Sequence, residues 1–215
     1  MKQIVEQLES RNPLQELRIE WVTDREAIRE SVWSKELDDQ INDISVDNLS
    51  NGAADKRPYA ISFVAGLHLW NDNLEDCHEA LQDSIIYGVH DTGSYWHGIM
   101  HRIEGDFGNT RYWTGKARNH PLFPELQTKI SAYLQNEANL DSLPESDTKQ
   151  ALIQVTEQSA WNPLFFIDIV ELQTNKEKNP ATEEIVKKVQ QLEIAILLQY
   201  TYEQSGGTGT IVDLA

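Results

Sequence analysis

The sequence contains a single cysteine, Cys77, among 215 residues, so no disulfide can form within the chain. Small secreted domains often depend on such cross-links, and their absence here favours a reducing compartment. No stretch approaches the roughly 20 consecutive apolar residues of a membrane-spanning helix. Charged residues also stand near the start of the chain, where a secretory signal would be continuously apolar. We therefore expect a cytoplasmic protein that has no membrane partner.

Basic residues are also scarce. The chain has 18 Lys and Arg against 35 Asp and Glu, which leaves a formal net charge of −17. A surface of this sign repels phosphate backbones and anionic lipid, so we expect neither nucleic acid nor membranes as partners. Hydrophobic residues make up 40% and charged residues 25% of the chain, which is typical of a globular protein. The simplest role of the acidic excess is to keep the protein soluble.

What the sequence does contain is helical spacing of apolar residues. From Tyr59 onward, apolar side chains recur at steps of three and four, as they do on one face of a helix. Asn71-Asp72-Asn73 interrupts this face with residues typical of turns, and Gly105-Asp106 does the same further along. We therefore predict paired helices around these two turns, over residues 59–70, 74–81, 92–104 and 107–118.

Similar spacing predicts further helices on both sides of this central pair. They cover about residues 24–41, 121–136, 148–173 with a break at Trp161-Asn162-Pro163, and 180–204. Residues 38–58 are expected to form a long surface connection, and no segment requires a β-sheet. We predict an all-α fold of antiparallel helical hairpins. It forms one domain over residues 1–204, with its core at residues 59–136 and a flexible, glycine-rich tail at 205–215.

The two central turns lie 34 residues apart, from Asp72 to Asp106 (106 − 72 = 34), which is the period of the tetratricopeptide helical hairpin. The second hairpin resembles that repeat more closely than the first, with matches at Gly98, Gly105-Asp106-Phe107, Ala117 and Pro121. It departs from the repeat at Thr110, where alanine is usual, and at His97 and His101, where leucine and tyrosine are usual. Two units are fewer than a solenoid needs, so the flanking helices are expected to cap the pair.

The segment from Ser94 to Trp113 concentrates histidine and aromatic residues. It resembles a group of uncharacterised bacterial and fungal proteins that share a His-x-Ile-Met-His-Arg-x-Glu-Gly-Asp-x-x-Asn-x-x-Tyr-Trp signature. In this sequence the signature reads His97-Gly-Ile-Met-His101-Arg102-Ile-Glu104-Gly105-Asp106, followed by Asn109 and Tyr112-Trp113. Residues 161–168 are similar to a second landmark of the group, and the resemblance covers roughly residues 60–204. It implies that the segment is important, and it assigns no reaction.

Within this segment, His97, His101 and Glu104 share one helical face because they are spaced by four and three residues. Two imidazoles and a carboxylate in this arrangement can bind Zn²⁺ or Fe²⁺ and leave positions for water or substrate. If the hairpins stack, His78 on the preceding helix faces the same space as a further ligand. The protein would then be a metal-dependent, hydrolase-like enzyme, with Glu104 as third ligand or general base. The alternative is that both histidines are structural and that Glu104 pairs with Arg102, Arg111 or Lys116.

The same segment also suits the binding of an anion. Arg102 is accompanied by four aromatic residues, and a guanidinium in an aromatic wall suits a small anionic ligand or the carboxylate of a peptide or protein partner. Asp106 and Asn109 at the adjoining turn are the remaining members of the predicted ligand-binding set. The aromatic members are Tyr95, Trp96, Tyr112 and Trp113.

Structural roles for these polar residues stay open at this point. Arg102 can form an internal ion pair with Glu104, Asp106 or Asp168, and Asp106 and Asn109 can serve the start of the next helix. Of the two functions, we favour a binding or interaction protein whose recognition surface is built around residues 95–113. The metal-dependent enzyme is the second hypothesis.

Two further features are expected to be purely structural. Cys77 falls within an apolar stripe, so we expect a small buried hydrophobic residue and not a nucleophile. The stripe His68, Asp72, Glu75 and Glu79 has a spacing that suits metal ligands, but it lies opposite the apolar face and is predicted to be solvated.

Overall fold

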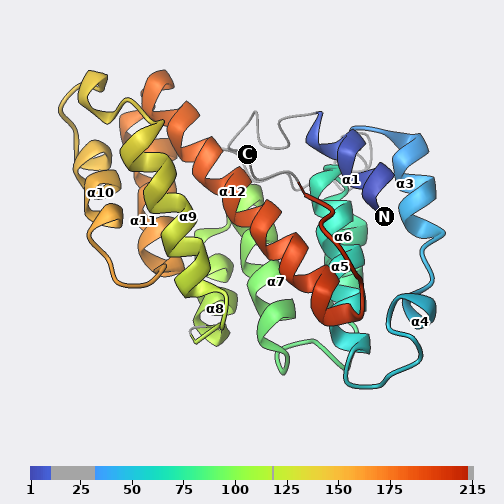
Figure 1. The fold of residues 1–215 in the computed structure, drawn as a ribbon. Coiled ribbons are helices and arrows are strands. Elements are labelled where there is room, and N and C mark those ends of the chain that lie inside the picture. The colour runs from blue at the N-terminus through green and yellow to red at the C-terminus, as the bar shows by residue number, and fades with distance from the viewer. Residues whose placement is uncertain (11–31, 118, 213–215) are drawn as a thin grey trace.

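The computed structural model describes residues 1–10, 32–117 and 119–212. All regular structure in these residues is helical, which confirms the predicted all-α class (Figure 1). The helices are α1 (Lys2–Glu9), α3 (Lys35–Asn42), α4 (Val46–Leu49), α5 (Arg57–Trp70), α6 (Leu74–Leu81), α7 (Asp91–Glu104), α8 (Phe107–Lys116), α9 (Phe123–Asn136), α10 (Asp147–Thr156), α11 (Pro163–Leu172) and α12 (Pro180–Ser205), with short turns at Leu140–Ser142 and Gln173–Glu177.

The predicted boundaries agree with the structure around the two central hairpins. Only three residues separate α5 from α6, and only two separate α7 from α8. The predicted break near Trp161 separates α10 from α11. Residues 24–31 of the predicted helix over 24–41 lie outside the described residues, and α3 accounts for its last part. The expected surface connection over 38–58 contains the end of α3 and the short α4.

Side-chain caps set the starts of α6 and α8. The Oδ1 atom of Asn73 accepts a hydrogen bond from the backbone N–H of Asp76 at 3.1 Å. The Asp106 carboxylate accepts one from the backbone N–H of Asn109 at 3.0 Å. Gly105, which ends α7, has a φ of +81°, a left-handed conformation that favours glycine. Asp106 therefore caps α8, as the structural alternative predicted.

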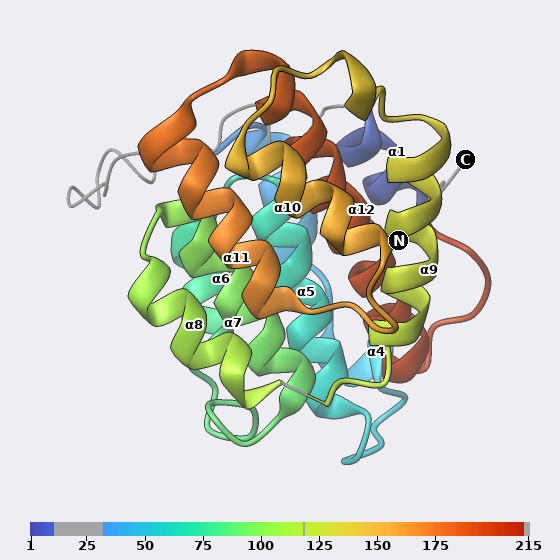
Figure 2. The same cartoon turned by 90° about the vertical axis from the view of Figure 1, so that its left-hand side faces the viewer.

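Helix α7 packs closely against α5, α6 and α8, which surround it in Figure 2. A Cβ atom at Gly98 would lie 2.3 Å from Oγ1 of Thr114 and 3.1 Å from its backbone nitrogen, so α7 and α8 approach within the space that only glycine allows. Gly66 of α5 meets the Trp96 ring in the same way, at 2.7 Å. The two hairpins are therefore in direct contact, while their likeness to tetratricopeptide repeats stays a prediction.

Helix α12 connects the two halves of the molecule: it runs diagonally across the view in Figure 1 and contacts both α5 and α9. Its buried apolar residues include Val186, Val189, Leu197 and Leu198. One hydrophobic cluster extends from α1 to the residues that follow α12. None of the described helices combines the length and the apolar character that are needed to cross a membrane.

The residues that follow α12 lie against that helix. The backbone N–H of Ile211 donates a hydrogen bond to Oε1 of Gln199 at 2.9 Å, and the Gln199 amide donates one to the carbonyl of Gly209 at 3.1 Å. Ile211 and Val212 are buried. The described part of the predicted flexible tail is therefore a packed segment, because its two apolar residues extend the core.

Candidate metal centre

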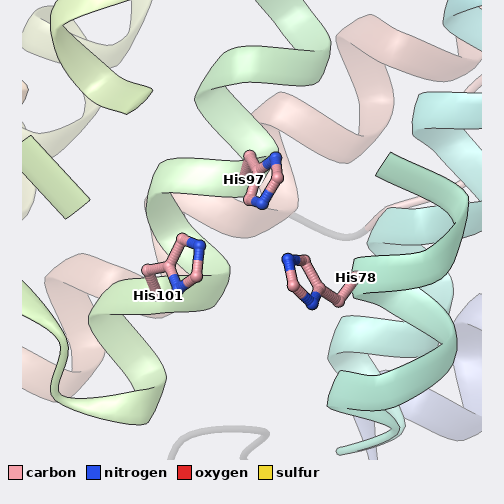
Figure 3. Close-up of side chains that lie close together, drawn as sticks. All are labelled: His78, His97 and His101. Carbon is pink, nitrogen blue, oxygen red and sulfur yellow. The ribbon is translucent and has the colours of Figure 1, made fainter. Parts of the chain in front are cut away.

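Three histidine side chains from α6 and α7 point toward one another (Figure 3). His97 and His101 lie one turn apart on α7, and His78 faces them from α6. One ring nitrogen from each residue lies within 4.8 Å of the other two. The ring centroids of His97 and His101 are 5.0 Å apart, and those of His78 and His97 are also 5.0 Å apart. We call His78, His97 and His101 the three-histidine group.

The sequence produces this arrangement through two helix faces that are packed together. The spacing of four residues puts His97 and His101 on the same side of α7. On α6, the apolar residues Leu74, Cys77 and Leu81 are buried, and this burial holds the helix in place. His78 lies at the edge of that buried face and is half-buried, whereas both α7 histidines are buried.

His97 is the residue whose environment points most directly to a metal ion. Its Nε2 atom is buried and has no hydrogen-bonding partner among the described residues. Burial, followed by the nearby His101 and His78, lowers the pKa of His97 to about 3, so its imidazole is neutral near pH 7. A buried polar atom without a partner costs about 1–3 kcal/mol. A cation bound at this nitrogen would remove that cost.

The other two histidines each have an outer partner. Nδ1 of His101 lies 2.9 Å from Oε2 of Glu104, which leaves the Nε2 atom of His101 as its ligand atom. The Gln82 amide nitrogen lies 3.2 Å from Nε2 of His78. A carboxylate that accepts a hydrogen bond from the second ring nitrogen, as Glu104 does for His101, fixes the ring orientation of a metal-binding histidine. Glu104 therefore contacts the outer nitrogen of His101 and is not part of the group of potential ligands. The sequence hypothesis had Glu104 as third ligand, and the structure has His78 in that place.

Cys77 lies next to His78 in the chain and is fully buried. Burial, with Glu104 and Asp76 adding to it, raises the pKa of the Cys77 thiol well above its usual value. The neutral thiol is a poor metal ligand, since the thiolate is the form that binds. Its structural assignment as a small hydrophobic residue therefore agrees with its position.

Aromatic side chains connect the three-histidine group to the surface. The Trp113 indole stacks on the His97 ring, with a centroid distance of 4.0 Å and an angle of 8°. Tyr87 packs edge-on against Trp113 at 4.9 Å, and its ring lies 6.0 Å from that of His97. Tyr87 is 50% exposed. Tyr87 was not among the site residues predicted from the sequence, although the apolar residues around it in a short interhelical segment were a signal for a surface site.

Three residues of the predicted ligand-binding set face the interior. Arg102 forms an ion pair with Glu193 of α12 and donates from Nε to the side-chain carbonyl of Gln190 at 2.7 Å. The Tyr95 hydroxyl donates to Glu193 at 2.5 Å. Trp96 is fully buried, with its indole N–H donating to Thr201 at 3.1 Å, a bond that joins it to the same long helix.

The predicted ligand contact by Arg102, Tyr95 and Trp96 is therefore corrected: these residues connect α7 to α12. They lie on the side of α7 that faces away from the three-histidine group. The internal ion pair that sequence analysis considered for Arg102 does form, but its partner is Glu193, which was not among the residues named.

The remaining members of the predicted set lie on α8. Asp106 and Asn109 are joined by a hydrogen bond of 2.7 Å from the Asn109 amide to the Asp106 carboxylate, within the helix cap. Tyr112 is 59% exposed, whereas Trp113 is buried. Lys116 lies on the same helix, with its ammonium nitrogen 5.0 Å from the centre of the Tyr112 ring.

A second group of potential ligands, Asp38, His68 and Asp76, is held together by hydrogen bonds. The Asn73 amide donates to Asp38 at 2.8 Å and to Asp76 at 2.7 Å. Nδ1 of His68 lies 3.2 Å from Asp38. An amide thus occupies the space between the carboxylates, and the group attaches α3 to the turn between α5 and α6. The prediction that His68 is solvated is wrong, because its exposed fraction is 3%.

Comparisons of the chain with family models, with curated proteins and with solved structures gave no significant match in any of the three. The function is therefore argued from the geometry of the three-histidine group and its surroundings.

Proposed function

We propose that the three-histidine group binds one divalent transition-metal ion and that the protein is a metal-dependent hydrolase. The observation that carries this proposal is the buried, partnerless Nε2 atom of His97, which lies among two further histidine nitrogens. Structural histidines in a helical core normally satisfy both ring nitrogens. A cation bound to this group would explain why the Nε2 atom of His97 has no other partner.

The ligand set favours Zn²⁺ over Fe²⁺. Three neutral imidazoles with a fourth position for water are a frequent catalytic zinc arrangement. The common non-haem iron site requires a carboxylate in direct contact with the metal, and Glu104 is already engaged with His101. Imidazole nitrogens bound to one tetrahedral zinc ion lie about 3.4 Å apart, given zinc–nitrogen bonds of about 2.0–2.1 Å. Small rotations of the three side chains would bring their nitrogens, now within 4.8 Å of one another, to that separation.

The surrounding residues would serve this chemistry by holding the ligands. When bound, a zinc ion activates water for attack on an electrophilic carbon or phosphorus atom. Glu104 holds the His101 ring by accepting a hydrogen bond from its Nδ1–H group, which makes Nε2 more basic. Trp113 holds the His97 ring by stacking on it, and its indole keeps bulk water from that side.

Metal analysis tests the proposal directly. Protein purified without a metal-affinity tag, dialysed against Zn²⁺ and then desalted should retain about one zinc ion per chain by elemental analysis. His78→Ala and His101→Ala should lose it, because each removes one of three ligands. His90→Asn is the matched control: His90 is a histidine outside the group that accepts a hydrogen bond from the backbone N–H of Gly93 at the start of α7, and asparagine can replace it there. Absence of zinc in the parent protein, or equal retention in all variants, would contradict the proposal.

A further inference from the structure

A patch of aromatic residues borders the three-histidine group, and two of its members, Tyr87 and Tyr112, are exposed while Trp113 is buried. Tyr87 and Tyr112 each pack against Trp113, with ring centroids 4.9 Å apart for Tyr87 and Trp113 and 5.2 Å apart for Tyr112 and Trp113. The ammonium nitrogen of Lys116 lies 5.0 Å from the Tyr112 ring centre and 5.9 Å from that of Trp113. We call these four residues the aromatic edge. Trp113 belongs both to this edge and to the wall of the three-histidine group.

The aromatic edge lies where the protein leaves most of its large apolar side chains exposed. Six large hydrophobic residues among the described ones are exposed, and four of them lie on the segment between α6 and α7 or on α8. Exposed apolar residues that cluster in one place often mark a binding site, whereas single exposed ones are common on any protein surface. These four residues are Ile85, Tyr87, Val89 and Tyr112.

Lys116 gives the aromatic edge a positive charge in a strongly acidic protein. No carboxylate of the described residues forms an ion pair with Lys116. By contrast, Arg111 on the same helix is neutralised by Asp168 at 2.8 Å and Glu171 at 2.5 Å. With a net charge of −17 for the whole chain, a lysine beside an exposed aromatic ring and outside every ion pair of the described residues suits an anionic group of a ligand. The rings suit a flat apolar group on the same ligand.

We infer that the aromatic edge binds a small aromatic carboxylate, and that this is the substrate class of the proposed metal site. The ligand ring would pack against Tyr87 and Tyr112, and its carboxylate would pair with Lys116. This inference rests on the proposed function, because Trp113 joins the edge to the three-histidine group. It also moves the anion recognition predicted from sequence away from Arg102, whose charge is already paired with Glu193, to Lys116.

Binding of 3-phenylpropionate to the full chain loaded with Co²⁺ tests this inference. Propionate lacks the ring and 3-phenylpropanamide lacks the charge, so these two compounds separate the contributions. We expect 3-phenylpropionate to bind about tenfold more tightly than propionate and about fivefold more tightly than the amide, by calorimetry. It should also change the visible absorption of the bound Co²⁺, because the edge and the metal site share Trp113.

Two exposed residues provide the variants. Lys116→Gln should weaken 3-phenylpropionate about fivefold and leave the amide unchanged, whereas Tyr112→Ala should weaken both. Lys129→Gln, at an exposed position of α9, is the matched control and should change neither. If Co²⁺ binds but 3-phenylpropionate binds no better than propionate, or Lys116→Gln has no effect, the inference is overturned and the proposed metal site stands. If Co²⁺ does not bind to the three-histidine group, both fall together.

Discussion

At the scale of single residues, His97 explains how three histidines can gather inside a helical pair. Burial and the two neighbouring imidazoles lower its pKa to about 3, so near pH 7 it adds no positive charge to the group and does not repel its neighbours. The neutral ring keeps a lone pair at one nitrogen, and that lone pair is available to a metal ion without competition from protons. The same buried environment thus keeps the His97 imidazole neutral and leaves its Nε2 atom without a hydrogen-bonding partner.

Glu104 provides a prediction at the same scale. Glu104→Ala removes the carboxylate that accepts from Nδ1 of His101, and we expect the affinity for Zn²⁺ to fall about 10- to 100-fold. Glu104→Gln should lose less, because its amide oxygen can still accept the hydrogen bond. Competition with a fluorescent chelator measures the affinity. Glu79→Gln on the exposed side of α6 is the control, and an alanine variant that matches it would show that Glu104 has no part in metal binding.

Residue positions were predictable from sequence only as far as helix geometry reaches. Spacing along α7 correctly predicted that His101 and Glu104 share a face, and the repeat of 34 residues led to the proposal that His78 faces them. Spacing cannot predict which neighbour a side chain selects. Glu104 forms a hydrogen bond with His101 and does not take the place of a third metal ligand beside His97 and His101. The partner of Arg102 is 91 residues away in the chain, beyond any local pattern.

At the scale of helices, the turns were the most predictable features because their chemistry is local. Asn73 and Asp106 both cap the helices that follow them, and such residues are strongly preferred at helix starts. The contact between α7 and α8 was less visible. It depends on Gly98, where the missing side chain lets Thr114 approach. The close approach of Thr114 also sets the position of the preceding residue, Trp113, which stacks on His97.

Two glycines test this packing. Gly98→Ala would place a Cβ atom 2.3 Å from Oγ1 of Thr114, and we expect it to lower the free energy of unfolding by about 1–3 kcal/mol despite alanine's better helix propensity. Gly115→Ala in α8 is the matched control: its Cβ atom would meet nothing within 4 Å, so it should raise stability by up to about 1 kcal/mol. Urea unfolding at one pH measures both. Equal effects of the two substitutions would show that α7 and α8 do not require the small residue.

At the scale of the whole molecule, one buried polar network joins three distant parts of the chain. Glu193 of α12 accepts hydrogen bonds from Tyr95 of α7 and from the Trp161 indole at 3.2 Å, and it pairs with Arg102. All four residues are buried, and the Arg102 guanidinium also lies 4.9 Å from the centre of the Phe166 ring. Buried charges of this kind are stable only together, because each is costly without its partner.

This network yields the prediction with the largest expected effect on stability. Arg102→Met leaves Glu193 as an unpaired buried charge, and we expect a loss of about 3–5 kcal/mol in the free energy of unfolding. Arg111→Met, which breaks an exposed pair with Asp168 and Glu171, should cost about 1 kcal/mol or less.

The double variant Arg102→Met with Glu193→Gln separates the loss of the ion pair from the loss of packing. It removes both charges and leaves an amide that Tyr95 and Trp161 can still contact, so it should recover at least half of the lost stability in urea unfolding. This comparison stays decisive even where Arg102→Met alone is too unstable to purify, since the double variant should then fold. A double variant that is less stable than Arg102→Met, or an Arg102→Met protein as stable as Arg111→Met, would mean that Glu193 does not depend on Arg102. The connection of α7 to α12 would then have to come from apolar packing alone.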